Sequence, residues 1–174
     1  MILFLDTVSP LPEFSLIADN KIIFSKKIIN NYHEKMSDYL IKSYTDLEKQ
    51  FSLDQNLENL IINIGPGSYT SLRIGIAFFS GLSLSYQIDL KGIPCADLLK
   101  YSISKEDLVS TGIYINSANN QKFICIYNKK KGYYNIHKIE NFSEIENFEI
   151  KKIISNTEFN QNDASLFKNI KYQY

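Results

Sequence analysis

The spacing of apolar and polar residues predicts a chain of short strands with two long helices. Apolar residues alternate with polar ones, or run together for the length of a strand, at 2–5, 14–18, 21–27, 60–64 and 90–93. Between residues 32 and 51 they recur at steps of three and four, which predicts an amphipathic helix. The second half repeats the strand pattern at 112–116, 122–128, 133–139 and 151–155, and a short turn of helix is expected near Leu166.

Residues 60–93 hold the most informative pattern. A short apolar run leads into the Gly-Pro-Gly-Ser sequence at 65–68, which predicts a tight turn whose serine caps a helix over residues 69–86. Arg73 is the only charged residue from residue 59 to residue 88, so this helix is apolar on more than one side. One side is expected to cover a sheet. The other side is covered either by the rest of the domain or by a partner's helix.

If a partner's helix covers that side, we expect the two long helices to form the interface. Its expected residues are Met36, Tyr39, Leu40, Arg73, Phe78, Phe79 and Leu82. Arg73 fits two roles equally well, because it can snorkel to solvent within its own domain or pair with a partner's carboxylate or phosphate.

The order of the elements predicts an α/β fold in two lobes. Three strands, a helix, a strand, a glycine turn, a helix and a strand succeed one another in residues 1–103, which predicts a mixed sheet with flanking helices. Pro94 starts a short helix over residues 95–103. Polarity rises around residues 104–110, and a smaller second lobe, mostly of strands, is expected over residues 110–174.

Composition and charge narrow the function classes. The chain has 174 residues, with 19 Lys plus Arg and 19 Asp plus Glu, and this balance argues against a free-standing nucleic-acid binder. The N-terminus lacks the basic region of a signal peptide, and no run is long enough to span a membrane, so we expect a cytoplasmic protein. Cys95 and Cys125 form neither a close pair nor a metal-ligand spacing and are expected in the core.

Two turns are candidates for phosphate or nucleotide contact. Asp6 and Thr7 follow the first strand, but Val8 stands where a phosphate-binding turn favours glycine, so a structural turn is the preferred interpretation. The turn with Gly65, Gly67 and Ser68 precedes a helix N-terminus, a generic anion site, and is again interpreted first as structural. His33 and His137 belong to no metal-binding motif, and we expect no catalytic residue and no metal.

The segment IGPGSYTSLRIGIAFFSGLSL, with ILFLDT at the start of the chain, resembles the TsaB (YeaZ) family. That family supplies a subunit of the bacterial machinery that makes threonylcarbamoyladenosine in transfer RNA. The resemblance implies the actin-like (ribonuclease H-like) fold shared with Hsp70 and the sugar kinases, in each of two lobes.

The resemblance also implies a role. The chain would be a catalytically inert scaffold whose helices bind and activate a catalytic paralogue, TsaD, joined by the ATPase TsaE. Transfer RNA would be bound only through the complex, the chain would carry no cofactor of its own, and ATP with Mg at the interface of the complex is left open.

The second lobe departs from the family pattern. Where relatives carry an Asp-Ala-Arg-like signature, this chain has Asn116, Ser117 and Ala118, followed by two asparagines. Two alternatives to the scaffold therefore stay open. One is a nucleotide-binding phosphotransferase that uses the two candidate turns, and the other is a stand-alone homodimer with a regulatory role.

Overall fold

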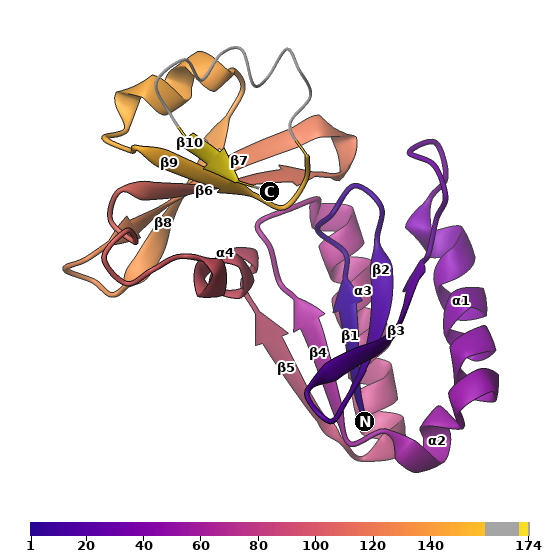
Figure 1. Ribbon diagram of the computed structural model, residues 1–174. Helices are drawn as coiled ribbons and strands as arrows, with labels where there is room; N and C mark the ends of the chain where they lie inside the picture. The colour runs from indigo at the N-terminus through magenta and orange to yellow at the C-terminus, as the bar shows by residue number, and fades with distance from the viewer. Residues whose placement is uncertain (159–170, 174) are drawn as a thin grey trace.

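Two five-stranded mixed sheets stand next to each other in the computed structural model, which describes residues 1–158 and 171–173 (Figure 1). In the first sheet the strand order is β3-β2-β1-β4-β5. Strands β1 to β3 are antiparallel to one another, and β4 and β5 continue parallel to β1. The elements of this first lobe are β1 (Ile2–Asp6), β2 (Glu13–Ala18), β3 (Lys21–Lys27), α1 (Met36–Phe51), α2 (Leu53–Asn56), β4 (Asn59–Asn63), α3 (Tyr69–Tyr86) and β5 (Asp89–Ile93).

The second sheet repeats this topology, with the order β10-β9-β6-β7-β8. Strands β6, β7 and β8 are antiparallel, and β9 and β10 lie parallel to β6, so β6 corresponds to β1 of the first lobe. The second-lobe elements are β6 (Thr111–Ser117), η2 (Ala118–Asn120), β7 (Gln121–Asn128), β8 (Tyr133–Ile139), η3 (Phe142–Asn147), β9 (Lys152–Ser155) and β10 (Lys171–Gln173).

Within the described residues, the connection between the third and fourth strands is shorter in the second lobe than in the first. Between β8 and β9 the chain forms only η3, a six-residue 3-10 helix, where the first lobe has the 16-residue α1. The predicted strands agree with the structure to within one or two residues, whereas β10 and η3 were not foreseen. The helical turn expected near Leu166 lies outside the described residues.

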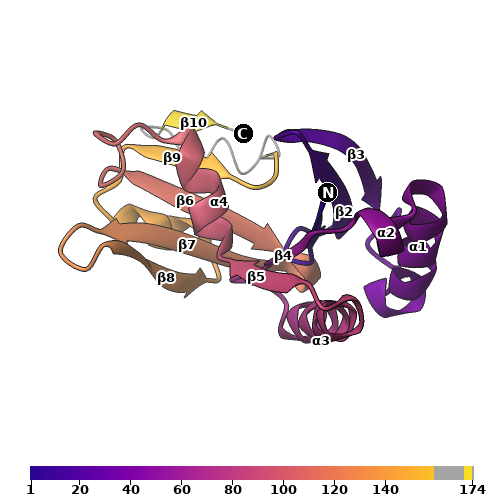
Figure 2. The same cartoon turned by 90° about the horizontal axis from the view of Figure 1, so that it is seen from below.

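Helices α1 and α3 cover one face of the first sheet (Figure 2). Alternate strand residues point to them and are fully buried, among them Leu5, Phe14 and Leu60. From α1, Leu40 and Leu47 enter the same core, as the period of three to four predicts. From α3, Phe79 stacks on Phe14 with ring centroids 6.2 Å apart.

Helix α1 begins at Met36, four residues later than the sequence predicts. The Glu34 carboxylate accepts hydrogen bonds from the backbone N–H groups of Asn30 and Asn31, and Asn31 Oδ1 accepts from His33 N. These local bonds give the backbone an alternative to the first helical turn.

The short helix α4 (Cys95–Leu99) and the 3-10 turn η1 (Lys100–Ser102) connect the lobes. Cys95 and Ala96 are buried in an apolar cluster with Ile113 and Cys125 of the second sheet, which also takes in Val8 from the first lobe. The segment assigned from the sequence to the first lobe therefore packs against the second. The boundary near residues 104–110 stays a prediction.

Candidate functional site

The carboxylate of Asp6, at the end of β1, accepts hydrogen bonds within its own turn. Its Oδ1 accepts from Val8 N at 2.8 Å and from Asn63 Nδ2 at 3.1 Å. The Ser9 hydroxyl donates to Oδ2 at 2.5 Å, and Ser9 N lies 3.3 Å from Oδ1. Both carboxylate oxygens are thus occupied by the chain itself, as in a turn that caps a strand.

Thr7 is fully buried beneath α3. A Cβ built on Gly75 would lie 2.6 Å from Thr7 Cγ2 and 3.1 Å from Ile62 Cδ1, so the helix backbone rests directly on β1 and β4. Thr7 Oγ1 has no hydrogen-bond partner within the described part of the chain. Because Thr7 has no exposed surface, it offers no contact to a ligand in this arrangement.

The glycine turn ahead of α3 is closed by contacts from both lobes. Gly65 has φ +101°, which requires glycine, and its N–H donates to Asn63 Oδ1 at 3.1 Å. Ser68 caps the helix as predicted, since its Oγ accepts from Ser71 N at 3.5 Å. The N–H of Ser68 donates to Ser117 Oγ of the second lobe at 2.9 Å. Two of the N–H groups at the start of α3, those of Ser68 and Ser71, therefore donate to hydroxyl oxygens of the chain itself.

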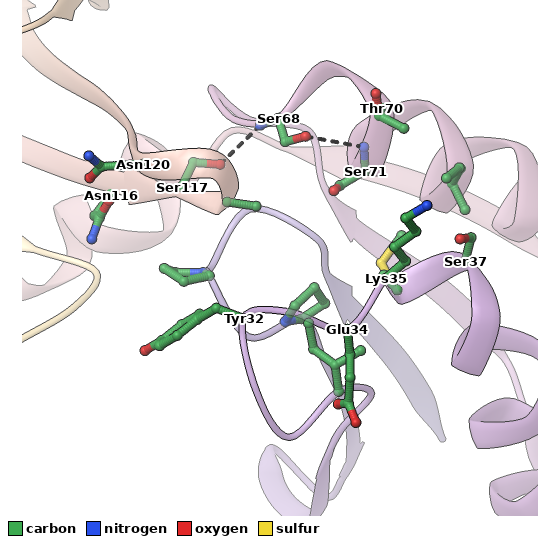
Figure 3. A pocket seen from close by; sticks show the side chains of 16 residues that line it. Tyr32, Glu34, Lys35, Ser37, Ser68, Thr70, Ser71, Asn116, Ser117 and Asn120 are labelled. Carbon is green, nitrogen blue, oxygen red and sulfur yellow. Dashed lines mark hydrogen bonds between the residues drawn. The ribbon is translucent and has the colours of Figure 1, made fainter.

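A cavity of about 610 Å³ opens between the lobes beside this turn (Figure 3). Its polar wall is made of hydroxyl and amide groups with one lysine and one glutamate, and Figure 3 shows Lys35 reaching from the start of α1 toward the start of α3. These polar lining residues are Tyr32, Glu34, Lys35, Ser37, Ser68, Thr70, Ser71, Asn116, Ser117 and Asn120. The Oδ1 atom of Asn116 is buried and has no hydrogen-bond partner among the described residues. Such a wall can donate and accept hydrogen bonds but adds little charge.

The predicted phosphate contacts are only partly brought together. Ser68 lines the cavity and Gly67 packs against Ser117, where an added Cβ would lie 3.0 Å from the hydroxyl oxygen. Asp6, Thr7 and Gly65 are held in the turns behind it. Within residues 1–158, no group of three or more His, Cys, Asp or Glu side chains is arranged to hold a metal ion.

Sequence reasoning missed Lys35 and Ser117 as cavity residues. The position of Ser117 follows from the topology of the two lobes. Ser117 ends β6 as Asp6 ends β1, and the turns after these two strands therefore face each other across the cleft. Lys35 carried no such signal, since its position depends on where α1 begins.

Three predicted interface residues are wrong as surface contacts. Met36, Leu40 and Phe79 are buried in the first-lobe core and present almost no surface to a partner. Phe78 and Leu82 are partly buried and pack against the same core, and the Phe78 ring meets the Tyr44 ring edge-on at 5.3 Å. Of the predicted set, Tyr39 and Arg73 are exposed.

The solvent side of α3 is a different stripe, called here the α3 face. It comprises Tyr69, Arg73, Ile76, Ala77, Ser80 and Leu84, which share one side of the helix. Leu84 is 81% exposed, and a Cβ added at neighbouring Gly81 would meet nothing within 4 Å. The Arg73 guanidinium lies over the Tyr69 ring at 5.2 Å. An 18-residue helix thus leaves one largely apolar side uncovered by the described chain.

A hydrogen-bonded chain ties α1 to α3. Tyr44 OH donates to Tyr86 OH at 2.8 Å, and Tyr86 OH donates to Glu48 Oε1 at 2.6 Å. Burial, followed by the bond to Tyr86, raises the pKa of the Tyr44 phenol, and burial followed by the bond to Glu48 raises that of Tyr86. These bonds, with the contact of the Tyr44 and Phe78 rings, hold α1 and α3 to each other.

No helix among the described residues is long and apolar enough to cross a membrane. Lys129, Lys130 and Lys131 are exposed in the turn between β7 and β8 and do not line the cavity.

The fold is that of two solved structures from Pseudomonas aeruginosa. One, described as an uncharacterized protein with similarity to peptidase YEAZ, has a TM-score of 0.55 and 18% identity over 78% of this chain and 62% of its own. The other, YeaZ, has a TM-score of 0.54 and 17% identity over 80% of this chain and 65% of its own. The chain thus spans less than two thirds of these relatives' length. A search of curated proteins found no match.

The predicted actin-like α/β fold is confirmed by these likenesses together with the duplicated sheet topology. The resemblance to YeaZ (TsaB) inferred from the sequence is borne out at the level of the fold. The profile of the family described as TsaD, tRNA N6-adenosine threonylcarbamoyltransferase, matches residues 29–163. Because the match covers most of the chain, this protein belongs to the family that the TsaD profile describes.

Proposed function

We propose that this chain is a non-catalytic, TsaB-like scaffold subunit of the complex that installs threonylcarbamoyladenosine next to the tRNA anticodon. It binds and activates a TsaD-like catalytic paralogue in the cytoplasm, and a TsaE-like ATPase joins the complex. The observation that carries the proposal is the α3 face, where Leu84 is 81% exposed and Arg73 is the only charged residue of the helix. A large apolar surface left in water is typical of an interaction site.

The α3 face continues onto α1. Ile41 is 67% exposed and lies one turn before Tyr44, on the side of α1 that meets α3. Ala77, Ser80 and Gly81 are small, so a partner's helix can approach the α3 backbone closely. The pair α1 and α3 is thereby suited to form a bundle with two helices of the paralogue, with Arg73 available to a partner's carboxylate.

A non-catalytic role is supported by the hydrogen bonds of Asp6 in the turn after β1. A nucleotide-binding lobe needs a carboxylate that is free to organise a metal ion. Both carboxylate oxygens of Asp6 instead accept hydrogen bonds from Val8, Ser9 and Asn63. The chain then needs no cofactor of its own. In this proposal, ATP and Mg bind at the interface of the complex, and transfer RNA binds only through the complex.

The test is co-purification with the catalytic paralogue of the same organism, read by size-exclusion chromatography with light scattering. We expect a one-to-one complex that Leu84→Glu abolishes, because a buried unpaired carboxylate is strongly unfavourable. Ile22→Glu is the matched control, since Ile22 is also 67% exposed but lies on β3, away from α3. A complex that tolerates Leu84→Glu would overturn the proposal. A homodimer that persists beside the paralogue would favour the regulatory alternative.

Nucleotide binding in the cleft is the second candidate. It is favoured by the cavity of about 610 Å³, which is lined by hydroxyls, amides and Lys35, with Glu34 as the one carboxylate. Titration of the isolated chain with ATP and Mg by calorimetry decides between the two. The scaffold proposal predicts no binding heat, whereas saturable binding that is weakened by Lys35→Gln would support the phosphotransferase.

A further inference from the structure

Positive charge is concentrated on the β7–β8 hairpin of the second lobe. The chain as a whole is neutral, yet residues 108–139 contain five lysines and no Asp or Glu. Three of these lysines, Lys129, Lys130 and Lys131, are consecutive in the turn. The following residues 140–149 reverse the sign, with four Glu and no Lys. Basic and acidic residues therefore occupy separate segments of the second lobe, although its net charge is small.

The turn holds its lysines in a defined arrangement. Asn128 Oδ1 accepts from the N–H groups of Lys130 and Lys131 at 3.1 Å, and Asn128 O accepts from Gly132 N at 2.8 Å. Gly132 adopts φ +74°, which closes the hairpin. Figure 1 shows this turn at the left edge of the second lobe, away from α3.

The charge of the turn is not neutralised nearby. Within the described ranges, none of the three lysines forms a salt bridge. The Glu144 carboxylate is turned to its own backbone, where it accepts from the N–H groups of Glu140 and Asn141 at 2.9 Å. Lys131 Nζ lies 5.5 Å from the ring centroid of Tyr133, whose side chain is 52% exposed. Lys131 therefore lies beside an accessible aromatic ring, in a turn whose three lysines form no salt bridge within the described ranges.

We propose that this basic hairpin, made of Lys129, Lys130, Lys131 and Tyr133, is an RNA contact of the second lobe. Lysines bind backbone phosphates and release counterions, and an exposed tyrosine beside them stacks on an unpaired base. A lipid surface would also favour the same lysines and the tyrosine ring, so the vesicle competition described below separates the two occupants. The choice of RNA rests on the proposed function, and it assigns to this chain a direct part in holding the tRNA substrate.

The experiment measures binding of a fluorescein-labelled, unmodified tRNA transcript by anisotropy as a function of salt. The protein is the full chain in complex with the paralogue, or the full chain alone at low salt if no complex forms. Replacing Lys129, Lys130 and Lys131 by Gln should weaken binding by about tenfold or more and reduce the log–log salt slope by about two. The matched control replaces Lys21, Lys27 and Lys49, which are exposed on the first lobe, and should change neither quantity as much.

Tyr133→Ala separates stacking from charge. It should weaken RNA binding while leaving the salt slope unchanged, because no phosphate contact is lost. The inference is overturned if the hairpin triple variant binds as tightly as wild type or no more weakly than the control triple. It is also overturned if vesicles containing phosphatidylserine compete better than unlabelled tRNA. Light scattering of the same samples reports complex formation separately, so failure of the RNA contact and failure of the scaffold proposal are distinguishable.

Discussion

The backbone N–H of Ser68 donates a 2.9 Å hydrogen bond to the Oγ of Ser117, and this bond joins the two lobes at the base of their cleft. Ser68 is the first-lobe residue that caps α3, and Ser117 is the last residue of β6 in the second lobe. Both are almost fully buried. One of the N–H groups at this helix N-terminus, which together would attract an anion, is therefore bonded to the chain's own hydroxyl.

We predict that Ser117→Ala lowers the free energy of unfolding by about 1–3 kcal/mol, because it leaves the buried N–H of Ser68 without an acceptor. Urea denaturation followed by circular dichroism measures the loss. Ser102→Ala, at an exposed serine in η1, serves as the control and should have little effect. Equal midpoints for the two variants would show that the bond does not couple the lobes.

Gly75 and Gly81 of α3 should respond oppositely to alanine. At Gly75 the new methyl group would lie 2.6 Å from Thr7 Cγ2, so Gly75→Ala should destabilise the chain by about 1–3 kcal/mol through overpacking. At Gly81 nothing lies within 4 Å, so Gly81→Ala should stabilise it by about 0.5–1 kcal/mol through helix propensity. Thermal unfolding of both variants checks the pair. A stabilising Gly75→Ala would contradict the close approach of α3 to β1.

Stability should fall above pH 10 partly because of Tyr44. Burial and its bond to Tyr86 raise the pKa of Tyr44 from its ordinary value of 10.0, so the unfolded chain releases this proton at a lower pH than the folded chain. The contribution is complete below pH 10 and is lost as the pH rises toward the folded pKa. Between pH 10 and 11, wild type should lose about 1 kcal/mol more than Tyr44→Phe. Urea titrations at each pH measure this, and parallel pH curves for the two proteins would rule it out.

The two cysteines should be inert until the chain unfolds. Cys95 and Cys125 are 3% and 0% exposed, and burial raises the pKa of each thiol to about 12. Iodoacetamide at pH 8 should therefore label them only at the rate of global opening, and rapidly in urea. Mass spectrometry of timed samples follows the reaction. Native labelling at the rate of a free thiol would mean that α4 opens separately from the second sheet.

The sequence predicts the strands well because alternation is a local signal. The rotation of α3 about its axis was not predictable in the same way. This helix is apolar nearly all round, so no polar stripe indicates which side faces the sheet. The rotation is set by the fit of Gly75 onto Thr7 and Ile62, which are distant in sequence. For that reason the sequence wrongly predicts Phe79 at the interface and gives no indication that Leu84 is exposed.

In the cleft, too, contacts between residues distant in sequence could not be predicted. Capping by Ser68 follows from residues within three positions, whereas its bond to Ser117 spans 49 residues and depends on how the second lobe is placed. The use of Asp6 as a turn cap was foreseen because its partners Val8 and Ser9 are adjacent in sequence.

The most direct test of the scaffold role is threonylcarbamoyl transfer to tRNA by the reconstituted catalytic paralogue, with three forms of this chain. Wild type should support transfer, and Leu84→Glu should abolish it by removing the α3 face. Asp6→Asn should retain it, because an amide can still accept from Val8 N and the Ser9 hydroxyl can reverse its bond. Full transfer with Leu84→Glu, or loss of transfer with Asp6→Asn in a complex that still forms, would contradict a non-catalytic scaffold.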